Sequence, residues 1–336
     1  MIGKTQNLIL IPIMVFFAAA FYRNIVWNDS MDLWQDAVNK SLQKARPHSN
    51  LGVIYVGKGL YDDAIREYKI ALELNPNYME THTNLGVAYT EKRMMDEAFA
   101  ELKTAIRMKP DSSEAHNNLG FAYLKTGRNE DAVKEFQIAV ELNPENYTAY
   151  YNYGIALRKS GKLDEAVDKL KISVYFKPDE SKSHFDLGVV YYAKGLLDDA
   201  VMEYKTALAL NPDFIDARNN LGAVYLKKGL LDDAERELKK VIDLKSDFVP
   251  VYGNLGVVYG SKGLIDEAIK IFKKAIELEP KEAGGYINLG FAYTQKGMIK
   301  EAEEEYRKAL IIDPDNSEAR QGIDAITKTL KGKSLN

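Results

Sequence analysis

The sequence contains no cysteine in its 336 residues. This absence excludes disulfide bonds, catalysis by a thiol and metal sites built from cysteine. The chain also lacks an excess of positive charge, because its 45 Lys and Arg residues face 49 Asp and Glu, for a formal net charge of −4. Such a chain has no general attraction to phosphate backbones, so we do not expect nucleic acid as a partner.

Motifs of enzyme active sites are absent as well. The sequence has no G-x-S-x-G, no H-E-x-x-H and no glycine-rich loop of the kind that binds phosphate. Its acidic pairs, such as Asp62-Asp63 and Asp232-Asp233, stand where helices are expected to begin, and there they suit the positive end of the helix dipole. We therefore expect a protein that binds other molecules, with no enzymatic activity and no cofactor.

The apolar run Leu8–Tyr22 is the feature that bears on location. Two interpretations stay open. Residues 1–27 form a membrane anchor, with residues 7–27 close to the roughly 20 residues that a bilayer core requires, or they form a signal peptide cleaved near Ala20. In both cases the rest of the chain is expected on the extracytoplasmic side, periplasmic or lumenal, either anchored or secreted. A third alternative is a cytosolic protein with an apolar start.

A 34-residue repeat organises the rest of the chain. The stretch His116-Asn117-Asn118-Leu119-Gly120 opens one unit, and the same pattern returns at this period without a slip in register. The Leu-Gly pair, once Tyr-Gly, stands at 51–52, 85–86, 119–120, 153–154, 187–188, 221–222, 255–256 and 289–290. A period this strict is typical of a solenoid, in which each unit contacts mainly its neighbours.

Each unit is predicted to fold as a helix, a tight turn and a second helix. In the third unit the first helix covers about 113–125, and Gly127 ends it in the left-handed conformation. In the second unit Arg93 stands at this turn. A glycine inside each first helix costs about 1 kcal/mol relative to alanine. We attribute it to close approach of the second helix, where an alanine such as Ala132 is expected to face Gly120.

Partial repeats are expected at both ends of the array. Residues 28–44 contain one amphipathic helix, in which Trp34 stands one period before Tyr68 of the first full unit. This segment is therefore predicted to be a half repeat that caps the solenoid. Eight full units follow over residues 45–316, and residues 317–336 are predicted to form a polar capping helix and tail.

The spacing of Leu-Gly, Tyr, Ala, an aromatic or Leu, Ala and Pro resembles the tetratricopeptide repeat (TPR) family over residues 45–316. The resemblance implies an all-α fold, a right-handed superhelical solenoid of antiparallel helix pairs. To this fold the apolar run Leu8–Tyr22 adds an N-terminal apolar helix, a membrane anchor or signal segment. It also implies that the first helices line a concave groove. The expected function is that of a membrane-anchored scaffold that binds extended protein or peptide segments in this groove.

The residue before each Leu-Gly pair is expected to point into the groove. These residues, the asparagine row, are Asn50, Asn84, Asn118, Asn152, Asp186, Asn220, Asn254 and Asn288. Two interpretations stay open: the amides bond the neighbouring repeat, or they bind the backbone of an extended peptide with one acceptor and two donors each. The row resembles one in the TPR region of O-linked N-acetylglucosamine transferase, which implies peptide binding by Asn84, Asn118, Asn152 and Asn220. The predicted groove further includes Asn254, Phe121, Tyr151, Phe185, Tyr192, Lys125 and Lys159.

All four histidines occupy one repeat position, four residues before the glycine, as His48, His82, His116 and His184. Equivalent positions in adjacent repeats are about 8–10 Å or more apart. Ligands of one zinc ion lie about 2 Å from it. We therefore expect no metal site. Because Tyr150, Tyr252 and Tyr286 fill the position elsewhere, we predict that it needs a bulky amphipathic side chain for packing.

The junction before the repeats carries a second resemblance. Polytopic transmembrane-TPR proteins are relatives of membrane glycosyltransferases, and the junction resembles the segment that joins their last membrane helix to their TPR tail. The residues that carry this resemblance are Arg23-Asn24, Trp27, Leu33-Trp34, Ser41, Arg46, His48 and Asn50-Leu51-Gly52. This implies an alternative function, a subunit that presents substrates to a glycosyltransferase partner. Another alternative is a self-assembling structural solenoid. The sequence leaves the oligomeric state open.

Overall fold

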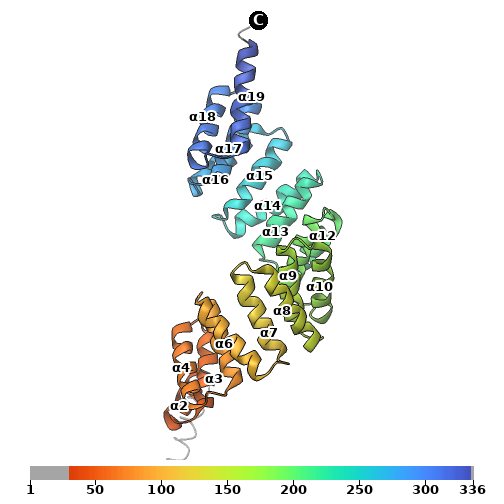
Figure 1. The fold of residues 1–336 in the computed structure, drawn as a ribbon. Helices are drawn as coiled ribbons and strands as arrows, with labels where there is room; N and C mark the ends of the chain where they lie inside the picture. The colour runs from red at the N-terminus through yellow and green to blue at the C-terminus, as the bar shows by residue number, and fades with distance from the viewer. Residues whose placement is uncertain (1–29, 334–336) are drawn as a thin grey trace, which may run out of the picture. The chain divides into compact units, whose positions relative to one another are not determined.

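The computed structural model describes residues 30–333. The predicted anchor or signal segment, residues 1–27, lies outside the described residues. Within them the chain is all α-helical, with 18 helices, and antiparallel pairs follow one another along the chain between a single helix at each end (Figure 1). The chain divides into two compact units, Met1–Lys169 and Leu170–Asn336. The predicted all-α array of helix pairs is thus confirmed.

Eight helix pairs make up the repeats. The first helices are α3 (Ala45–Gly57), α5 (Met79–Glu91), α7 (Ser113–Lys125), α9 (Tyr147–Lys159), α11 (Ser181–Ala193), α13 (Ile215–Lys227), α15 (Val249–Ser261) and α17 (Ala283–Lys296). The second helices are α4 (Tyr61–Leu74), α6 (Met95–Met108), α8 (Asn129–Leu142), α10 (Leu163–Phe176), α12 (Leu197–Leu210), α14 (Leu231–Leu244), α16 (Ile265–Leu278) and α18 (Ile299–Ile312).

The turn inside each pair has a left-handed residue, as predicted. Seven turn glycines have φ between 74° and 81°, and in the second repeat Arg93 takes this conformation with φ 60°. A side chain is disfavoured there because Cβ comes too close to the following carbonyl oxygen. The start of each second helix carries the expected acids, such as Asp198 and Asp199 on α12.

The glycines inside the first helices, such as Gly120 and Gly290, are explained by a contact between the two helices of a pair. A Cβ at Gly120 would lie 2.8 Å from the ring of Phe136, and one at Gly290 would lie 2.9 Å from the ring of Tyr306. The predicted approach of the second helix is correct, but the predicted neighbour is wrong. The nearest atoms belong to the large residue 16 positions later, while Ala132 is a fully buried part of the core.

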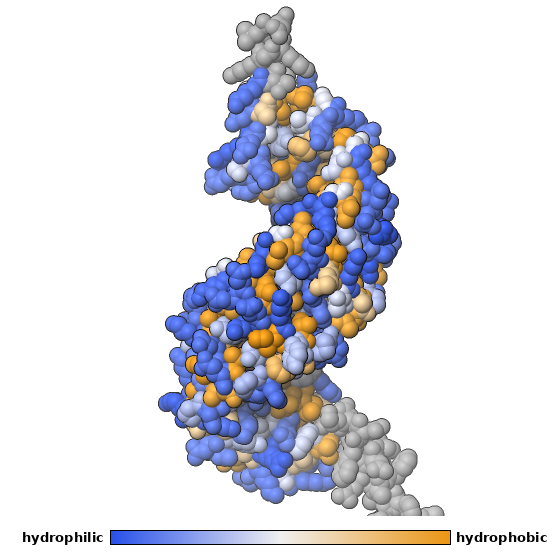
Figure 2. Space-filling model, turned by 90° about the vertical axis from the view of Figure 1, so that its right-hand side faces the viewer, coloured by the Kyte–Doolittle hydropathy of each residue, from blue (hydrophilic) through white to orange (hydrophobic). Residues whose placement is uncertain are grey.

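The first helices stand closer together than the second helices in each unit. First helices of neighbouring repeats contact each other from α3 through α9 in one unit and from α11 through α17 in the other, whereas second helices contact each other less. The first helices therefore lie on the inner side of the curve in each unit. The molecular face in Figure 2 is mostly hydrophilic, with apolar side chains interspersed between the polar ones.

Single helices follow the pattern of caps at the ends of the described chain. α2 (Ser30–Lys40) packs on α3, and Met31, Trp34 and Val38 join the core of the first repeat. α19 (Ser317–Lys333) packs on α18 and buries Ala319 and Ile326. Each of these helices covers the apolar side of the repeat next to it.

Candidate peptide-binding surface

The asparagine row lies on the first helices, one residue before a buried leucine, or before the buried Tyr153 on α9. The side chains of Asn84, Asn118 and Asn152 are half-buried in the unit that ends at Lys169. Those of Asn220 and Asn254 are half-buried in the unit that begins at Leu170. Each unit therefore presents its own series of amides along its first helices.

Hydrogen bonds connect part of the row to the neighbouring repeat. Asn152 Nδ2 donates to Asn117 Oδ1 at 3.0 Å, and Asn117 Nδ2 donates to Asn118 Oδ1 at 3.3 Å. The acceptor Asn117 is buried and stands one residue before Asn118 on α7. For Asn152 this arrangement agrees with the interpretation that the amide bonds the neighbouring repeat.

The second unit repeats this pattern. Asn254 Nδ2 donates to Asn219 Oδ1 at 3.0 Å, and Asn219 Nδ2 donates to Asn220 Oδ1 at 3.4 Å. Asn220 Nδ2 in turn lies 3.5 Å from the hydroxyl of Tyr204. Asn117 and Asn219 were not singled out from the sequence. Their pattern was nevertheless visible, because two successive asparagines precede Leu-Gly in these two repeats only.

Other members of the row keep unused hydrogen-bonding capacity. Among residues 30–333, the side chain of Asn84 makes no hydrogen bond, and the side chain of Asn118 only accepts one. The residue before Asn84 is Thr83, whose hydroxyl donates to the carbonyl oxygen of Met79 on its own helix. The amide of Asn84 is thus open to a ligand.

Aromatic and cationic side chains accompany the amides in the first unit. The ammonium of Lys125 lies 5.0 Å from the centre of the Phe121 ring, one turn away on α7. Tyr151 is half-buried on α9, next to Asn152, and Lys159 is exposed at the end of that helix. These residues and the amides of α5, α7 and α9 form one continuous set on the first helices.

The predicted aromatic residues of the second unit are held within the protein. The Phe185 ring packs against Phe214 and Tyr204, with ring centres 4.8 Å and 5.9 Å apart. Tyr192 is half-buried, and the ammonium of Lys227 lies 4.8 Å from its ring centre. Tyr204 is almost fully buried, so Phe185 turns at least one side of its ring toward the core.

The histidine position has a polar role that packing alone does not describe. In all four cases Nδ1 lies 2.5–2.7 Å from the carboxylate of the glutamate 19 residues later. Nε2 lies 3.0–3.3 Å from the carbonyl oxygen of the residue six positions earlier. Each ring nitrogen faces an acceptor. Through Nδ1 the histidine of the first helix contacts the glutamate of the second helix, and through Nε2 it contacts the backbone of the segment that precedes the repeat. The pairs are His48–Glu67, His82–Glu101, His116–Glu135 and His184–Glu203.

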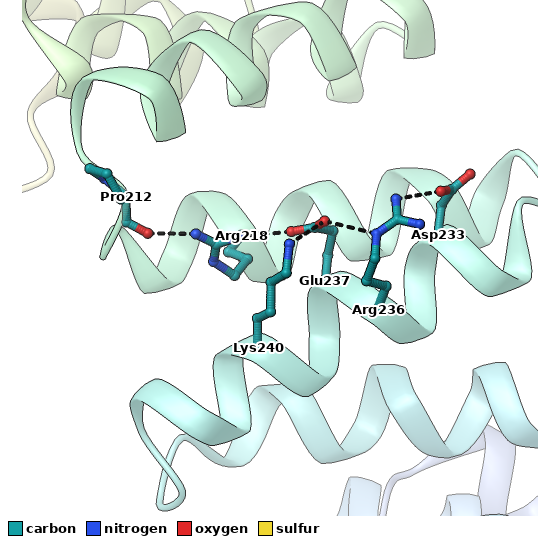
Figure 3. A network of polar contacts seen from close by, with 6 residues as sticks. All are labelled: Pro212, Arg218, Asp233, Arg236, Glu237 and Lys240. Carbon is teal, nitrogen blue, oxygen red and sulfur yellow. Dashed lines mark hydrogen bonds and ion pairs between the residues drawn. The ribbon is translucent and has the colours of Figure 1, made fainter.

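Arg218 occupies the same position in the sixth repeat and makes the same two connections. Nη1 lies 2.8 Å from Glu237 Oε2, and Nη2 donates to the carbonyl oxygen of Pro212 at 2.5 Å (Figure 3). Lys240 also contacts Glu237, at 3.2 Å. Burial raises the pKa of the Glu237 carboxyl, but the hydrogen bonds from Lys240 and Arg218 outweigh it and hold this pKa below its usual range.

The residue types at the histidine position and at the position 19 residues later occur together, and this pattern was visible in the sequence. Wherever the position holds His or Arg within the eight repeats, the residue 19 positions later is Glu. Of the three tyrosines at this position, Tyr150 and Tyr252 are followed by Lys169 and Ile271, whereas Tyr286 is followed by Glu305. Tyr252 instead donates from its hydroxyl to the carbonyl oxygen of Ser246. The histidines, Arg218 and Tyr252 at this position therefore share a polar group that reaches the backbone carbonyl oxygen of the residue six positions earlier.

Comparison with known proteins agrees with this geometry. Models of the tetratricopeptide repeat match the chain at residues 52–92, 95–127, 117–181, 190–229, 215–248 and 261–325, which together cover more than half of it. The chain belongs to the tetratricopeptide repeat family. No curated protein sequence matches it.

Two solved structures show the same tetratricopeptide repeat fold. One is described as the anaphase-promoting complex (APC/C) hetero-tetramer Cut9-Hcn1, at 15% identity and a TM-score of 0.60, matched over 87% of this chain and 57% of that chain. The other is a tetratricopeptide repeat protein from Parabacteroides merdae ATCC 43184, at 17% identity and a TM-score of 0.60, matched over 74% and 98%. At these identities the likeness concerns the fold alone.

Two further properties of the repeats bear on function. Within residues 30–333, no group of three or more His, Asp or Glu side chains is arranged to hold a metal ion. None of the described helices combines the length and apolar character needed to cross a bilayer. The segment for which we predict membrane insertion, residues 7–27, lies outside the described residues.

Proposed function

We propose that this tetratricopeptide repeat protein is a scaffold that binds extended segments of partner proteins along its first helices. The observation that carries the proposal is the asparagine row, a series of half-buried amides at one position of successive first helices. Asn84 and Asn118 retain donors or acceptors that no described residue uses. An extended backbone offers alternating donors and acceptors that suit such amides.

Charge on the first unit favours an acidic, partly apolar segment. Lys125 and Lys159 are exposed at the ends of α7 and α9, one repeat apart. Phe121 offers an apolar ring beside Lys125. A carboxylate of a bound segment would meet these ammonium groups, while its backbone pairs with Asn84 and Asn118.

We also propose that residues 7–27 anchor the scaffold to a membrane, with the repeats on the extracytoplasmic side. The apolar run and the positive charge of Lys4 before it support this orientation. Cleavage near Ala20 is the alternative, with a secreted product. Mass spectrometry of the N-terminus of the mature protein separates the two, because only the anchor retains residues 1–20.

The experiment that tests peptide binding uses a phage-displayed library of random peptides on the full-length protein in mild detergent. We expect peptides rich in acidic residues to be enriched. Their affinity should fall by a few kcal/mol in sum for the double variant Asn84→Ala and Asn118→Ala, at about 1 kcal/mol for each hydrogen bond lost. A library that yields no binder, or binders indifferent to this variant, overturns the proposal.

Asn152→Ala is the matched control for this experiment. Its amide is already bonded to Asn117. We therefore expect Asn152→Ala to lower stability more than it lowers peptide affinity. The single variant Asn84→Ala should keep the melting temperature of the wild type, since the side chain of Asn84 makes no hydrogen bond among residues 30–333. The double variant also removes the acceptor of Asn117 Nδ2, so it should lose about as much stability as Asn152→Ala while losing more peptide affinity.

The two other functions that the sequence suggests stay predictions. A glycosyltransferase-presenting subunit requires a transferase that co-purifies with the chain and a glycosylation defect when the chain is deleted. A self-assembling solenoid requires particle growth with concentration in light scattering, reduced by changes in residues 317–331. No contact among residues 30–333 favours either over peptide binding.

A further inference from the structure

Helix α15 carries two glycines that neither the backbone nor the core requires. Gly253 and Gly260 stand two turns apart on one side of the helix. A Cβ at Gly253 would meet open space, and one at Gly260 would find only Gln295 Oε1 at 3.9 Å. Gly256 on the same helix differs, because the ring of Phe272 fills the space beside it. Glycine weakens a helix interior relative to alanine, so fold stability does not account for the two glycines.

Gly253 leaves an amide of the asparagine row without the kind of acceptor that Asn152 and Asn254 have. Asn254 donates to Asn219, which directly precedes Asn220, the member of the row in the preceding repeat. For Asn288 on α17 the equivalent residue is Gly253, which has no side chain. Of the hydrogen bonds found among residues 30–333, none involves the side chain of Asn288. This amide is therefore available to a ligand.

Gly260 opens a pocket beside that amide. The neighbouring repeats carry Leu226 and Thr294 at the position of Gly260, and in every other repeat this position holds a side chain. A pocket of about 280 Å³ lies here between α15 and α17, with Phe272 of α16 also in its wall. The residues that α17 contributes share one helix face and are Asn288, Phe291, Ala292 and Gln295.

The chemistry of the pocket selects an uncharged apolar group. No charged side chain lines it. Val257 and Phe291 in its wall are 41% and 58% exposed, although both are apolar. Its volume is below the roughly 300–1,000 Å³ of pockets that enclose a whole small molecule. One bulky side chain, with its backbone at the surface, fits a space of this size and character.

We propose that this pocket takes one bulky uncharged side chain, aromatic or leucine-like, from an extended segment of a partner protein. The backbone on either side of that residue pairs with the amides of Asn288 and Gln295, which stand at both ends of the Phe291 wall. The inference rests on the proposed function, because it names one residue class within the segment that the scaffold binds. A charged side chain is excluded, since it would lose its hydration without gaining a counter-charge.

The test uses full-length protein in mild detergent and N-acetyl-4-fluoro-phenylalanine methylamide as probe, followed by fluorine NMR. We expect saturable broadening of the probe signal with the wild type. The leucine derivative should displace the probe, and the glutamate and lysine derivatives should not. Gly260→Leu fills the pocket with the residue found at this position in α7 and α13, and should weaken probe binding at least tenfold.

Thr294→Leu is the matched control, because it introduces the same residue at the same repeat position on α17, outside the pocket wall. It should bind the probe as the wild type does, and both variants should keep the helical circular dichroism of the wild type. In this probe experiment the pocket assignment is overturned by no probe binding to the wild type, by equal binding to Gly260→Leu, or by equal displacement by the glutamate derivative.

Failure of this inference is distinguishable from failure of the proposed function. Library peptides that bind the wild type and Gly260→Leu equally overturn the pocket and leave the peptide-binding function standing. A library that yields no binder overturns both. Asn288→Ala adds a second test with the pocket left open, because the probe methylamide should then bind more weakly while its side-chain selectivity is unchanged.

Discussion

The Nδ2 atom of Asn152 donates a hydrogen bond to Oδ1 of Asn117, 3.0 Å away, and so joins the first helices α9 and α7. Asn84 occupies the equivalent position on α5 without such a bond among residues 30–333. The same residue type at the same repeat position therefore has two roles. One amide connects repeats, and the other is available to a ligand.

The first prediction separates these roles by stability. Asn152→Ala removes one hydrogen bond and leaves the buried Asn117 without its donor, so it should lower the free energy of unfolding by about 1 kcal/mol. Asn84→Ala should change it by less than about 0.5 kcal/mol, the usual range for a side chain without such partners. Urea unfolding followed by circular dichroism measures both. Equal effects of the two substitutions would contradict the distinction.

The second prediction concerns the glycine inside a first helix. Gly120→Ala places a Cβ 2.8 Å from the buried Phe136 ring, and we expect a loss of about 1–3 kcal/mol from overpacking. Gly253→Ala is the control, since its Cβ would meet open space. There the better helix propensity of alanine should raise stability by about 0.5–1 kcal/mol. Opposite signs for two glycine-to-alanine changes in first helices are the decisive outcome in thermal or urea unfolding.

The third prediction concerns the left-handed turn of the second repeat. Arg93 has φ 60°, whereas the other turns of this kind hold glycine. Arg93→Gly should stabilise the protein by about 1 kcal/mol, because it removes the contact between Cβ and the following carbonyl oxygen. Gly127→Arg, the reverse change one repeat later, should destabilise by a similar amount. A melting temperature lowered by Arg93→Gly would show that the Arg93 side chain contributes more than its backbone costs.

The fourth prediction concerns the Glu237 network and pH (Figure 3). The pKa of Glu237 lies below its usual range in the folded protein, so its ionisation stabilises the fold above the unfolded-state pKa of about 4.3. This contribution is lost as the pH falls through the lower, folded-state pKa. Glu237→Gln should therefore cost about 1–3 kcal/mol at pH 7, and the difference from the wild type should shrink in acid below about pH 4.

Glu277→Gln is the control for this pH dependence. Glu277 pairs with Lys274 at 2.9 Å, but its side chain is 68% exposed. Exposed pairs contribute about 0–1 kcal/mol, so this change should be small and nearly independent of pH. Unfolding free energies of the wild type and both variants, measured between neutral pH and acid, test the prediction. A pH-independent cost of Glu237→Gln would exclude an ionised Glu237 as its cause.

The repeat and its turns were predictable because they depend on local rules. Leu119 and Gly120 recur at a fixed period, and Gly127 is required by a left-handed backbone that few residues adopt. The facing residue of Gly120 was predicted wrongly, because the sequence shows only that something must be close. Which side chain of α8 reaches Gly120 depends on how the two helices are rotated, and that rotation placed Phe136 there.

The functional surface was less predictable, because it depends on pairs of positions in different helices. The row containing Asn84 and Asn152 is visible at once, but the bond to Asn117 crosses from one repeat to the next. His116 and Glu135 are 19 residues apart, and each alone looks like an ordinary surface residue. Comparing the same two positions across all repeats would have revealed the pair, since the glutamate follows each histidine.

The spacing of the histidine–glutamate pairs has a consequence for how the array can change in length. His116 and Glu135 belong to the same 34-residue block, while the backbone carbonyl that completes the contact belongs to the residue closing the previous block. A carbonyl is present whatever that residue is. A genetic duplication or excision of one whole block would therefore carry both partners together and leave no orphaned carboxylate at the new joint. The histidine–glutamate contacts therefore do not restrict the number of repeats, whereas the bond from Asn152 to Asn117 does, because its two partners belong to different blocks.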